Sequence, residues 1–218
     1  MNIVKPNKDF DAWYIDNFIP SAGLVRAAAE SFDRLAPEWW VSYGDEGQIG
    51  KCSPASINSI THECLLVMDY ISTHFDTSML NKEDQTFPDL TGYGGGMMIT
   101  PNKNGEGGFL GMHIDAQTHK INTNWKREYS VVLGLSEDYD SSFDLRLHDG
   151  EKHCRLQYKF NRLNIFKFHE NSWHGFPEIT KGKDRKTIGL MYWSIYKDTT
   201  EEDMFFTKAR FNHELDFA

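Results

Sequence analysis

Cysteine is scarce in this chain, with three residues among 218: Cys52, Cys64 and Cys154. Their number is odd and no C-x-x-C pair occurs, so the sequence indicates neither a disulfide framework nor a zinc site built from thiolates. Scarce, unpaired cysteine is typical of proteins in a reducing compartment. We therefore expect a cytoplasmic protein.

Long apolar runs are also missing. The N-terminal residues MNIVKPNKDFDAWYIDNF contain no continuous apolar stretch of the signal-peptide kind. No apolar run approaches the roughly 18 residues that a membrane-spanning helix needs. The sequence therefore predicts a protein that is neither exported nor embedded in a membrane.

Positive charge is in the minority, with 23 Lys and Arg against 32 Asp and Glu and a formal net charge of −9. Because phosphate backbones are bound by clustered basic side chains, a nucleic acid is not the expected partner. The chain is 14% aromatic, and its length is sufficient for one domain with a large apolar core. We therefore expect a single domain over residues 1–218.

Several catalytic signatures are absent as well. The sequence has no H-E-x-x-H zinc motif, no nucleophile elbow around a Ser or Cys, and no G-x-x-x-x-G-K-[ST] phosphate loop. The glycines within 92–96 do not form G-x-G-x-x-G, so they indicate turns and not a dinucleotide site. These absences disfavour zincins, Ser or Cys hydrolases and nucleotide-binding enzymes.

The first 80 residues are predicted to form a helical brace. Residues 13–19 indicate a short strand, and apolar residues at helical spacing between Ser21 and Pro37 predict a helix. Glycine and proline within 41–56 indicate a loop. A second apolar stripe predicts a helix over 56–75, and we expect both stripes to be buried in the core.

After residue 76 the chain changes to short β-rich segments separated by Gly and Pro turns. This spacing predicts a mainly β fold with N-terminal helices, in which a sandwich or barrel lies behind the helical layer. Residues 199–215 are expected to form a last short helix. The seven predicted strands cover 97–100, 109–115, 129–135, 143–149, 155–160, 162–168 and 187–196.

The triplet His113-Ile114-Asp115 carries two metal-binding side chains two residues apart. On a strand, residues i and i+2 point to the same side, so both can reach one ion. His174 is predicted to lie in a loop. The strand-like segments between His113 and His174 are long enough to bring the chain back across a barrel, so His174 could be the third ligand. His169 is the nearest alternative for this ligand. Two His and one carboxylate form a ligand face that leaves the other side of an Fe(II) ion open.

Arg185 opens a predicted strand, on which it shares a face with Thr187 because alternate residues point the same way. A guanidinium can hold a carboxylate through two parallel hydrogen bonds, and a threonine can add a hydroxyl donor. The two residues are therefore candidates for binding 2-oxoglutarate. The alternatives are that Arg185 is a solvated charge in the run KGKDRK, or that Lys186 takes the role, although alternation directs Lys186 to the opposite face.

These residues and their surroundings resemble the prolyl-hydroxylase-like Fe(II)/2-oxoglutarate-dependent oxygenases. The resemblance covers roughly residues 90–196 and is carried by the strings GGGMMIT, GGFLGMHIDAQTH, REYSVVLGLSEDYD and FNRLNIFKFHENSWHGFPEI. It implies a double-stranded β-helix, the jelly-roll or cupin-like fold. The helical brace would cover about 1–80 and the jelly-roll core about 90–196.

The resemblance also implies an iron centre with 2-oxoglutarate and O2 as co-substrates and ascorbate as an optional reductant. The implied Fe(II) ligands are His113, Asp115 and His174. The residues implied to bind 2-oxoglutarate or line its pocket are Arg185, Thr187, Thr100, Leu133 and Leu145.

The implied reaction is hydroxylation of an unactivated C–H bond with release of succinate and CO2. Asp115 favours this outcome because related halogenases lack the carboxylate. Thr100 and Leu133 stand where prolyl-hydroxylating members often carry tyrosine, so the substrate is left as a small molecule or a prolyl or other peptidyl residue. Loops 101–108 and 116–126 are predicted lids. Four nearby cations could meet an acidic substrate: Lys103, Lys120, Lys126 and Arg127.

Two other classes of protein stay open at this point. A cupin-type metal enzyme would use the same ligands without 2-oxoglutarate, and Arg185 would then be dispensable. A non-catalytic binding module would keep the fold and bind Fe(II) and 2-oxoglutarate without forming succinate. The sequence does not indicate an oligomeric state.

Overall fold

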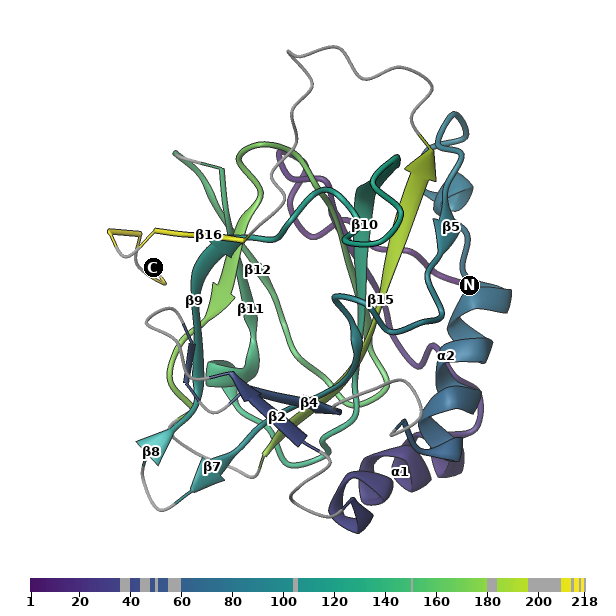
Figure 1. The fold of residues 1–218 in the computed structure, drawn as a ribbon, viewed down its shortest axis with the longest axis vertical. Coiled ribbons are helices and arrows are strands. Elements are labelled where there is room, and N and C mark those ends of the chain that lie inside the picture. Colours follow the sequence, from purple (N-terminus) through teal and green to yellow (C-terminus); the bar gives the residue numbers. More distant parts are fainter. Residues whose placement is uncertain are drawn as a thin grey trace.

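The fold consists of two antiparallel β-sheets that face each other, with two helices on the outer side of the larger sheet (Figure 1). The protein is described by a computed structural model. The residues that it describes are 1–35, 40–43, 48–49, 51–54, 60–103, 106–149, 151–179, 184–195, 209–212, 214–215 and 217.

The larger sheet has eight strands and the smaller sheet has six. Across the larger sheet the order is β1 (Ala12–Ile15), β13 (Leu163–Lys167), β10 (Trp125–Gly134), β15 (Arg185–Ile195), β6 (Gly96–Thr100), β4 (Lys51–Pro54) and β2 (Trp40–Tyr43), and β5 (Phe87–Pro88) pairs with β15. Across the smaller sheet the order is β12 (His153–Leu156), β11 (Leu145–His148), β14 (Trp173–Phe176), β9 (Phe109–Ile114) and β16 (Arg210–Phe211), and β3 (Gln48–Ile49) pairs with β9.

Two α-helices cover the outer face of the larger sheet. Helix α1 (Ala22–Ser31) starts at Ser21, whose hydroxyl accepts a hydrogen bond from the backbone N–H of Leu24 at 3.3 Å. Helix α2 (His62–His74) buries Cys64, Val67, Met68 and Ile71. In the described part of the chain, short 3-10 turns also lie at η1 (Phe32–Arg34), η4 (Thr77–Met79) and η5 (Ser141–Phe143).

Strand alternation divides the larger sheet into a helix side and a cavity side. On β10, Val131 and Leu133 are fully buried in the apolar core under the helices. Their neighbours Ser130 and Val132 line a cavity between the two sheets. Because successive side chains of a strand point to opposite faces, one strand supplies both the core and the cavity wall.

The expected fold class is confirmed: the molecule is mainly β, with N-terminal helices, and forms a double-stranded β-helix. Several local predictions were wrong. The predicted loop over 41–56 contains β2, β3 and β4, whose pairing with the larger sheet and with β9 overrides the local Gly and Pro signals. His174 lies in β14 and not in a loop. In the predicted last helix, β16 forms a strand, while residues 199–208 lie outside the described part.

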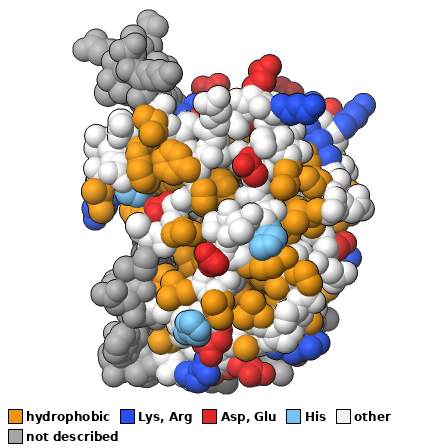
Figure 2. All heavy atoms as spheres, turned by 90° about the vertical axis from the view of Figure 1, so that its right-hand side faces the viewer, with side chains coloured by type: hydrophobic (Ala, Val, Ile, Leu, Met, Phe, Trp, Pro, Cys, Tyr) orange, Lys and Arg blue, Asp and Glu red, His pale blue; other side chains and the backbone are white. Residues whose placement is uncertain are grey.

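Figure 2 views the molecule from the side of α2, where apolar side chains lie among polar and charged ones. The exposed apolar residues of α2 are Leu65 and Leu66, which are 40% and 43% exposed. Scattered exposure of this kind is ordinary for a protein surface. Among the described residues, no helix is long and apolar enough to cross a membrane.

We expect the substitution Ile71→Ala to lower the free energy of unfolding by about 2–5 kcal/mol, because it opens a hole in the core between α2 and the larger sheet. The matched control is Leu65→Ala on the same helix, where a 40% exposed side chain should cost about 0.5 kcal/mol or less. Urea unfolding followed by circular dichroism measures both. Equal losses in the two variants would contradict this packing of α2.

Candidate active site

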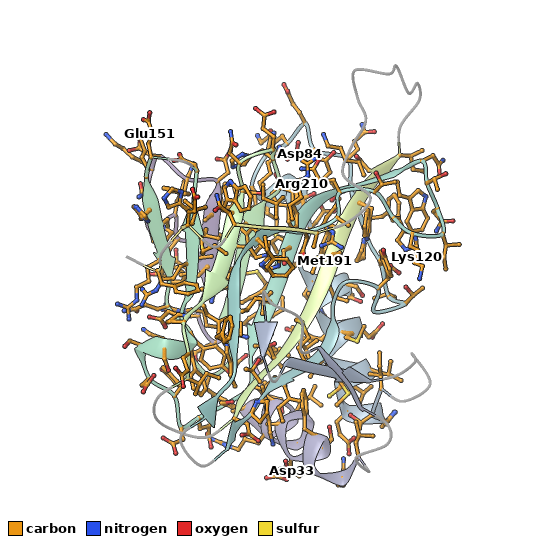
Figure 3. All side chains as sticks on the ribbon, turned by 60° about the vertical axis from the view of Figure 1, so that its left-hand side comes forward. Asp33, Asp84, Lys120, Glu151, Met191 and Arg210 are labelled. Atoms are coloured by element: carbon orange, nitrogen blue, oxygen red, sulfur yellow. The ribbon has the colours of Figure 1, made fainter. Side chains whose placement is uncertain are left out.

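The cavity between the sheets combines apolar walls with a few polar groups. Its apolar lining comes from both sheets: Met98, Leu110, Val132, Leu145, Phe166, Phe176 and Met191. Its polar or charged lining residues are Thr100, His113, Asp115, Ser130, Asn164, His174 and Arg185, and Gly94 completes the wall. In Figure 3, Met191 lies between the sheets, whereas Lys120 lies on an outer loop.

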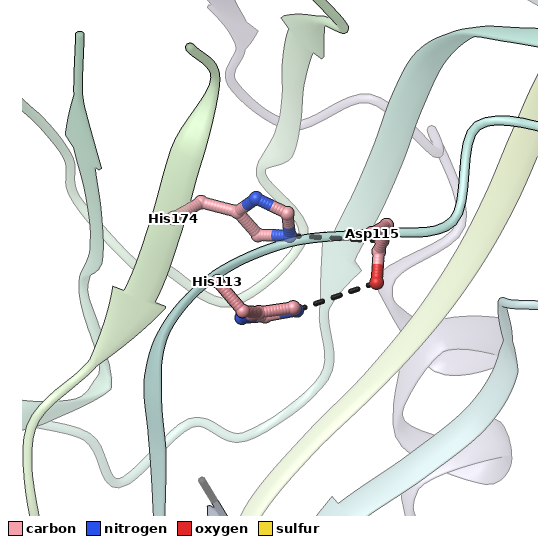
Figure 4. A group of neighbouring side chains, drawn as sticks. All are labelled: His113, Asp115 and His174. Carbon is pink, nitrogen blue, oxygen red and sulfur yellow. Dashed lines mark ion pairs between the residues drawn. The ribbon is translucent and has the colours of Figure 1, made fainter. Parts of the chain in front are cut away.

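Three side chains converge at one end of this cavity (Figure 4). Nε2 of His113 lies 3.3 Å from Oδ1 of Asp115, and Nε2 of His174 lies 3.6 Å from Oδ2 of the same carboxylate. One ligand atom from each residue falls within 4.8 Å of the other two. Both histidines are buried, and Asp115 is partly exposed. The structure thus brings together the three residues predicted to bind Fe(II).

The pairing of β9 with β14 places the two imidazoles next to each other. His174 pairs with His113 and Phe176 with Leu110, so β9 takes one more residue than β14 over the same distance. This bulge turns His113 to the same side as Leu110, where strict alternation would turn it away. Gly175 permits the close approach, because a Cβ atom there would come within 2.5 Å of the carbonyl oxygen of Leu110.

Backbone carbonyls determine which ring nitrogen of each histidine is free. Nδ1 of His113 donates to the carbonyl of Gly111 at 2.9 Å, and Nδ1 of His174 donates to the carbonyl of Ser172 at 3.1 Å. A carbonyl can only accept, so Nδ1 carries the proton and Nε2 presents its lone pair toward Asp115. Such a bond to the other ring nitrogen is the usual way in which a metal-binding histidine is oriented.

The charges of the three converging side chains favour binding of a cation between them. Burial lowers the pKa of His174, and repulsion from His113 lowers it further, so the ring is neutral. Burial alone would raise the pKa of Asp115, but the Arg127 guanidinium and the contacts with His113 and His174 together outweigh it and hold this pKa well below the usual value. The imidazoles of His113 and His174 and the carboxylate of Asp115 then direct their ligand atoms at one point. A divalent ion would satisfy all three, and these donor types fit Fe(II).

Arg185 lies at the start of β15 and is 8% exposed. Its Nε donates to the carbonyl of Phe143 at 3.0 Å, and its guanidinium carbon lies 4.2 Å from the centre of the Phe176 ring. Burial lowers its pKa to about 10, so the group is still charged at neutral pH. Among the described residues, no carboxylate forms an ion pair with it. The cavity therefore holds a buried cation that has room for an anion.

Two buried polar atoms on the larger sheet are unsatisfied. Oγ1 of Thr187 and Oδ1 of Asn164 are buried and have no hydrogen-bond partner among the described residues. Thr187 shares the cavity-facing side of β15 with Arg185, and Asn164 lines the cavity. Buried polar atoms without partners are rare in folded proteins and often mark the place of a ligand or water. Thr187 is two residues from Arg185 on the same face of β15, so its unsatisfied hydroxyl fits a bound carboxylate compound.

Of the remaining predicted pocket residues, two line the cavity and one does not. Thr100 pairs with Arg185 across β6 and β15, and Thr100 and Leu145 both line the cavity. Leu133 does not, because alternation on β10 turns it into the helix-side core. The expectation that Leu133 lines the pocket is therefore corrected: its neighbour Val132 occupies that position.

The loop 116–124 connects β9 to β10 directly after Asp115. Its His119 lies 3.3 Å from Oδ2 of Asp89, and both side chains are buried. The ring of His119 also contacts Trp125 and Trp193, with centroid distances of 5.1 and 5.0 Å. The loop is thus tied to the larger sheet near the metal-binding side chains. The other predicted lid contains a two-stranded hairpin, β7 (Asn102–Lys103) and β8 (Glu106–Gly107).

Arg127 is the principal site residue whose role the sequence did not reveal. Its guanidinium Nη1 donates to Oδ2 of Asp115 at 2.5 Å. The sequence predicted only that this cation would lie near the site, where it could meet an acidic substrate. In the structure its partner is Asp115 instead. No sequence signal distinguishes it from the exposed Lys120 on the loop that precedes β10.

We expect His113→Ala and His174→Ala to abolish binding of Mn(II), a substitute for Fe(II), because each removes one of three converging ligands. The control is His169→Ala, which removes an exposed imidazole from the turn before β14 and should bind Mn(II) like the wild type. The electron paramagnetic resonance signal of free Mn(II) measures binding, and circular dichroism checks the fold. Unchanged binding in both ligand variants would contradict the site.

Comparison with known proteins gave one family match and many structural matches. The model of the 2OG-Fe(II) oxygenase superfamily matches residues 97–193, which include His113, Asp115, His174 and Arg185. A search of curated protein sequences found no match.

Similar solved structures share the fold at low sequence identity. A prolyl-4-hydroxylase from Pseudomonas putida is 15% identical, with a TM-score of 0.56 over 84% of this chain and 92% of that chain. A prolyl hydroxylase from Trichoplax adhaerens, in complex with a hypoxia inducible factor peptide fragment, is 16% identical, with a TM-score of 0.57 over 84% and 83%. The epimerase SnoN from nogalamycin biosynthesis is 9% identical, with a TM-score of 0.58 over 84% and 77%.

The family match, the shared fold and the His-Asp-His cluster agree with the resemblance seen in the sequence, which is thereby confirmed. Residues 97–193, which contain the His-Asp-His cluster and Arg185, match the 2OG-Fe(II) oxygenase superfamily, and this match supports an Fe(II)- and 2-oxoglutarate-dependent dioxygenase.

Proposed function

We propose that the protein hydroxylates an unactivated C–H bond, with Fe(II) held by His113, Asp115 and His174 and with 2-oxoglutarate held by Arg185 and Thr187. One observation carries this proposal: the same cavity holds a site for a metal ion and a separate site for an anion. Three metal-type ligands converge in it, and a buried arginine without a carboxylate partner among the described residues also lines it. A dianion that ligates the metal and also ends in a second carboxylate fits both features.

The distal carboxylate of 2-oxoglutarate would meet Arg185 through its terminal nitrogens, since Nε is already bound to the carbonyl of Phe143. Thr187 would donate its unsatisfied hydroxyl, while Thr100 and Leu145 would form the wall of this part of the cavity. A guanidinium that is already oriented by a backbone bond and an aromatic ring is preorganised for a bidentate pair.

When bound, the iron and 2-oxoglutarate supply the oxidising chemistry: one oxygen atom of O2 enters succinate, the other enters the substrate C–H bond, and CO2 leaves. The chain's own residues hold the partners and keep water out. Asp115 occupies the position at which a halide would otherwise sit, which favours hydroxylation. The walls formed by Met98, Val132, Phe166 and Met191 are apolar and suit an uncharged C–H-bearing group.

The substrate is proposed to be a small molecule or a prolyl or other peptidyl residue. The peptide-bound prolyl hydroxylase among the similar structures supports a peptidyl residue, and the epimerase supports a small molecule. No cation other than Arg185 lines the cavity among the described residues, so a substrate whose reacting part carries an anionic group is disfavoured.

We expect Arg185→Ala to raise the KM for 2-oxoglutarate by about 10- to 100-fold, because it removes a charged hydrogen-bond donor worth about 1.5–3 kcal/mol. The control is Lys186→Ala on the adjacent position of β15. Lys186 points to the helix side, where its Nζ donates to Asp33 at 2.8 Å, so its loss should leave this KM within twofold.

The measurement is succinate release from 2-oxoglutarate in air with Fe(II), followed by nuclear magnetic resonance and repeated with candidate substrates. Wild-type succinate release with an unchanged KM in Arg185→Ala would contradict the role of Arg185, whereas substrate oxidation that needs no 2-oxoglutarate and is unchanged in this variant would favour a cupin-type enzyme. Tight binding of Fe(II) and 2-oxoglutarate without succinate from any substrate would favour a non-catalytic binding module.

A further inference from the structure

Arg127 is a buried cation that engages one oxygen of the proposed carboxylate ligand. Its side chain is 3% exposed, and Nη1 donates to Oδ2 of Asp115 at 2.5 Å. Oδ1 of the same carboxylate lies 3.3 Å from Nε2 of His113. Oδ2 also lies 3.6 Å from Nε2 of His174, but it already accepts the arginine hydrogen bond. The two carboxylate oxygens therefore stand in different environments.

A β-bulge aims Arg127 at the site. Arg127 pairs with Trp193, and Tyr129 pairs with Tyr192, so β10 takes two steps where β15 takes one. In regular pairing without the bulge, alternation would place Arg127 on the same side as Tyr129, which is buried in the helix-side core. Bulges are over-represented beside active sites, where they redirect a side chain. The backbone departs from regular pairing at the residue that reaches Asp115.

The surroundings of Arg127 fix its guanidinium in place. The guanidinium carbon lies 5.3 Å from the centre of the Phe168 ring and 5.2 Å from that of Trp193, which stabilises the cation away from water. Gly94 has a φ of +70°, and a Cβ atom there would come within 2.4 Å of Nη2 of Arg127. A larger residue at this position would displace the guanidinium, so glycine serves both the turn and the arginine.

From these contacts we propose that Arg127 is a positioning residue, which holds Oδ2 of Asp115 so that the carboxylate offers one oxygen to the metal. The proposal rests on the assignment of Asp115 as a metal ligand under the proposed function. A carboxylate can bind a metal through one oxygen or through both. A hydrogen-bonded partner on one oxygen favours the single-oxygen mode, as interactions behind a metal ligand commonly do.

The number of open metal positions depends on this choice. Three ligand atoms leave about three positions of an octahedral ion open, and 2-oxoglutarate with O2 needs all of them. If Asp115 bound through both oxygens, one of these positions would be lost. Arg127 thereby keeps room at the metal without touching the substrate or the reacting atoms.

Mn(II) alone can test this, because the water molecules bound to it report the open positions. We would load the wild type, Arg127→Met and Arg127→Lys with Mn(II) and measure the enhancement of water-proton relaxation. The control is Arg162→Met, which removes another arginine that is 3% exposed, bound to Asp16 through Nε and Nη2 at 2.6 and 2.8 Å, and placed over the Tyr14 ring.

We expect Arg127→Met to lose about one third of the enhancement, corresponding to one of about three bound waters. Arg127→Lys, which keeps the cation, should recover most of it, and Arg162→Met should match the wild type. The same enhancement in Arg127→Met and the wild type would overturn the proposal. An equal loss in Arg162→Met would overturn it as well, since the cause would then be general damage to the fold.

The outcome is separate from that of the proposed function, because the measurement needs neither 2-oxoglutarate nor turnover. A protein that forms no succinate, yet loses Mn(II)-bound water in Arg127→Met, would retain the positioning role and lose the proposed reaction. In a catalytically active protein, Arg127→Met should also weaken 2-oxoglutarate binding to the Fe(II)-loaded enzyme by about 10- to 100-fold. Wild-type affinity for 2-oxoglutarate in that variant would count against the proposal.

Discussion

The antiparallel pairing of β9 with β14 is the constraint on which the site depends. It places His113 opposite His174, and the bulge on β9 turns His113 into the cavity that His174 also lines. Backbone carbonyls then fix Nδ1 of each ring, and Asp115 follows directly at the end of the strand. A shift of one residue in this pairing would turn the side chains of β9 to the other face and disperse the ligands.

Two buried arginines give the cavity its charge pattern. Arg127 is neutralised by Asp115, whereas Arg185 has no carboxylate partner among the described residues. A buried charge without a partner costs folding free energy, so a site that keeps a buried arginine without a carboxylate is expected to bind an anion. The pattern therefore explains why a compound with two carboxylates suits this cavity, one at the metal and one at Arg185.

The sequence predicted the strands, the two helices and the converging residues because these follow from alternation, helical spacing and residue chemistry. The i, i+2 spacing of His113 and Asp115 and the return of His174 were visible without coordinates. The bulges on β9 and β10 could not be predicted, because a bulge is defined by how one strand pairs with its neighbour. For the same reason the roles of Arg127 and Leu133 could not be read from the sequence: each depends on the face to which β10 turns it.

The most direct test of the account is an anaerobic titration of Fe(II) and 2-oxoglutarate into the metal-free protein, followed by visible absorption. We predict a weak charge-transfer band from 2-oxoglutarate chelated to iron, which fades when O2 is admitted as succinate is released. A band that never forms, in a protein whose Asp115→Ala variant binds Fe(II) as the wild type does, would contradict the assignment of His113, Asp115 and His174 as the metal centre.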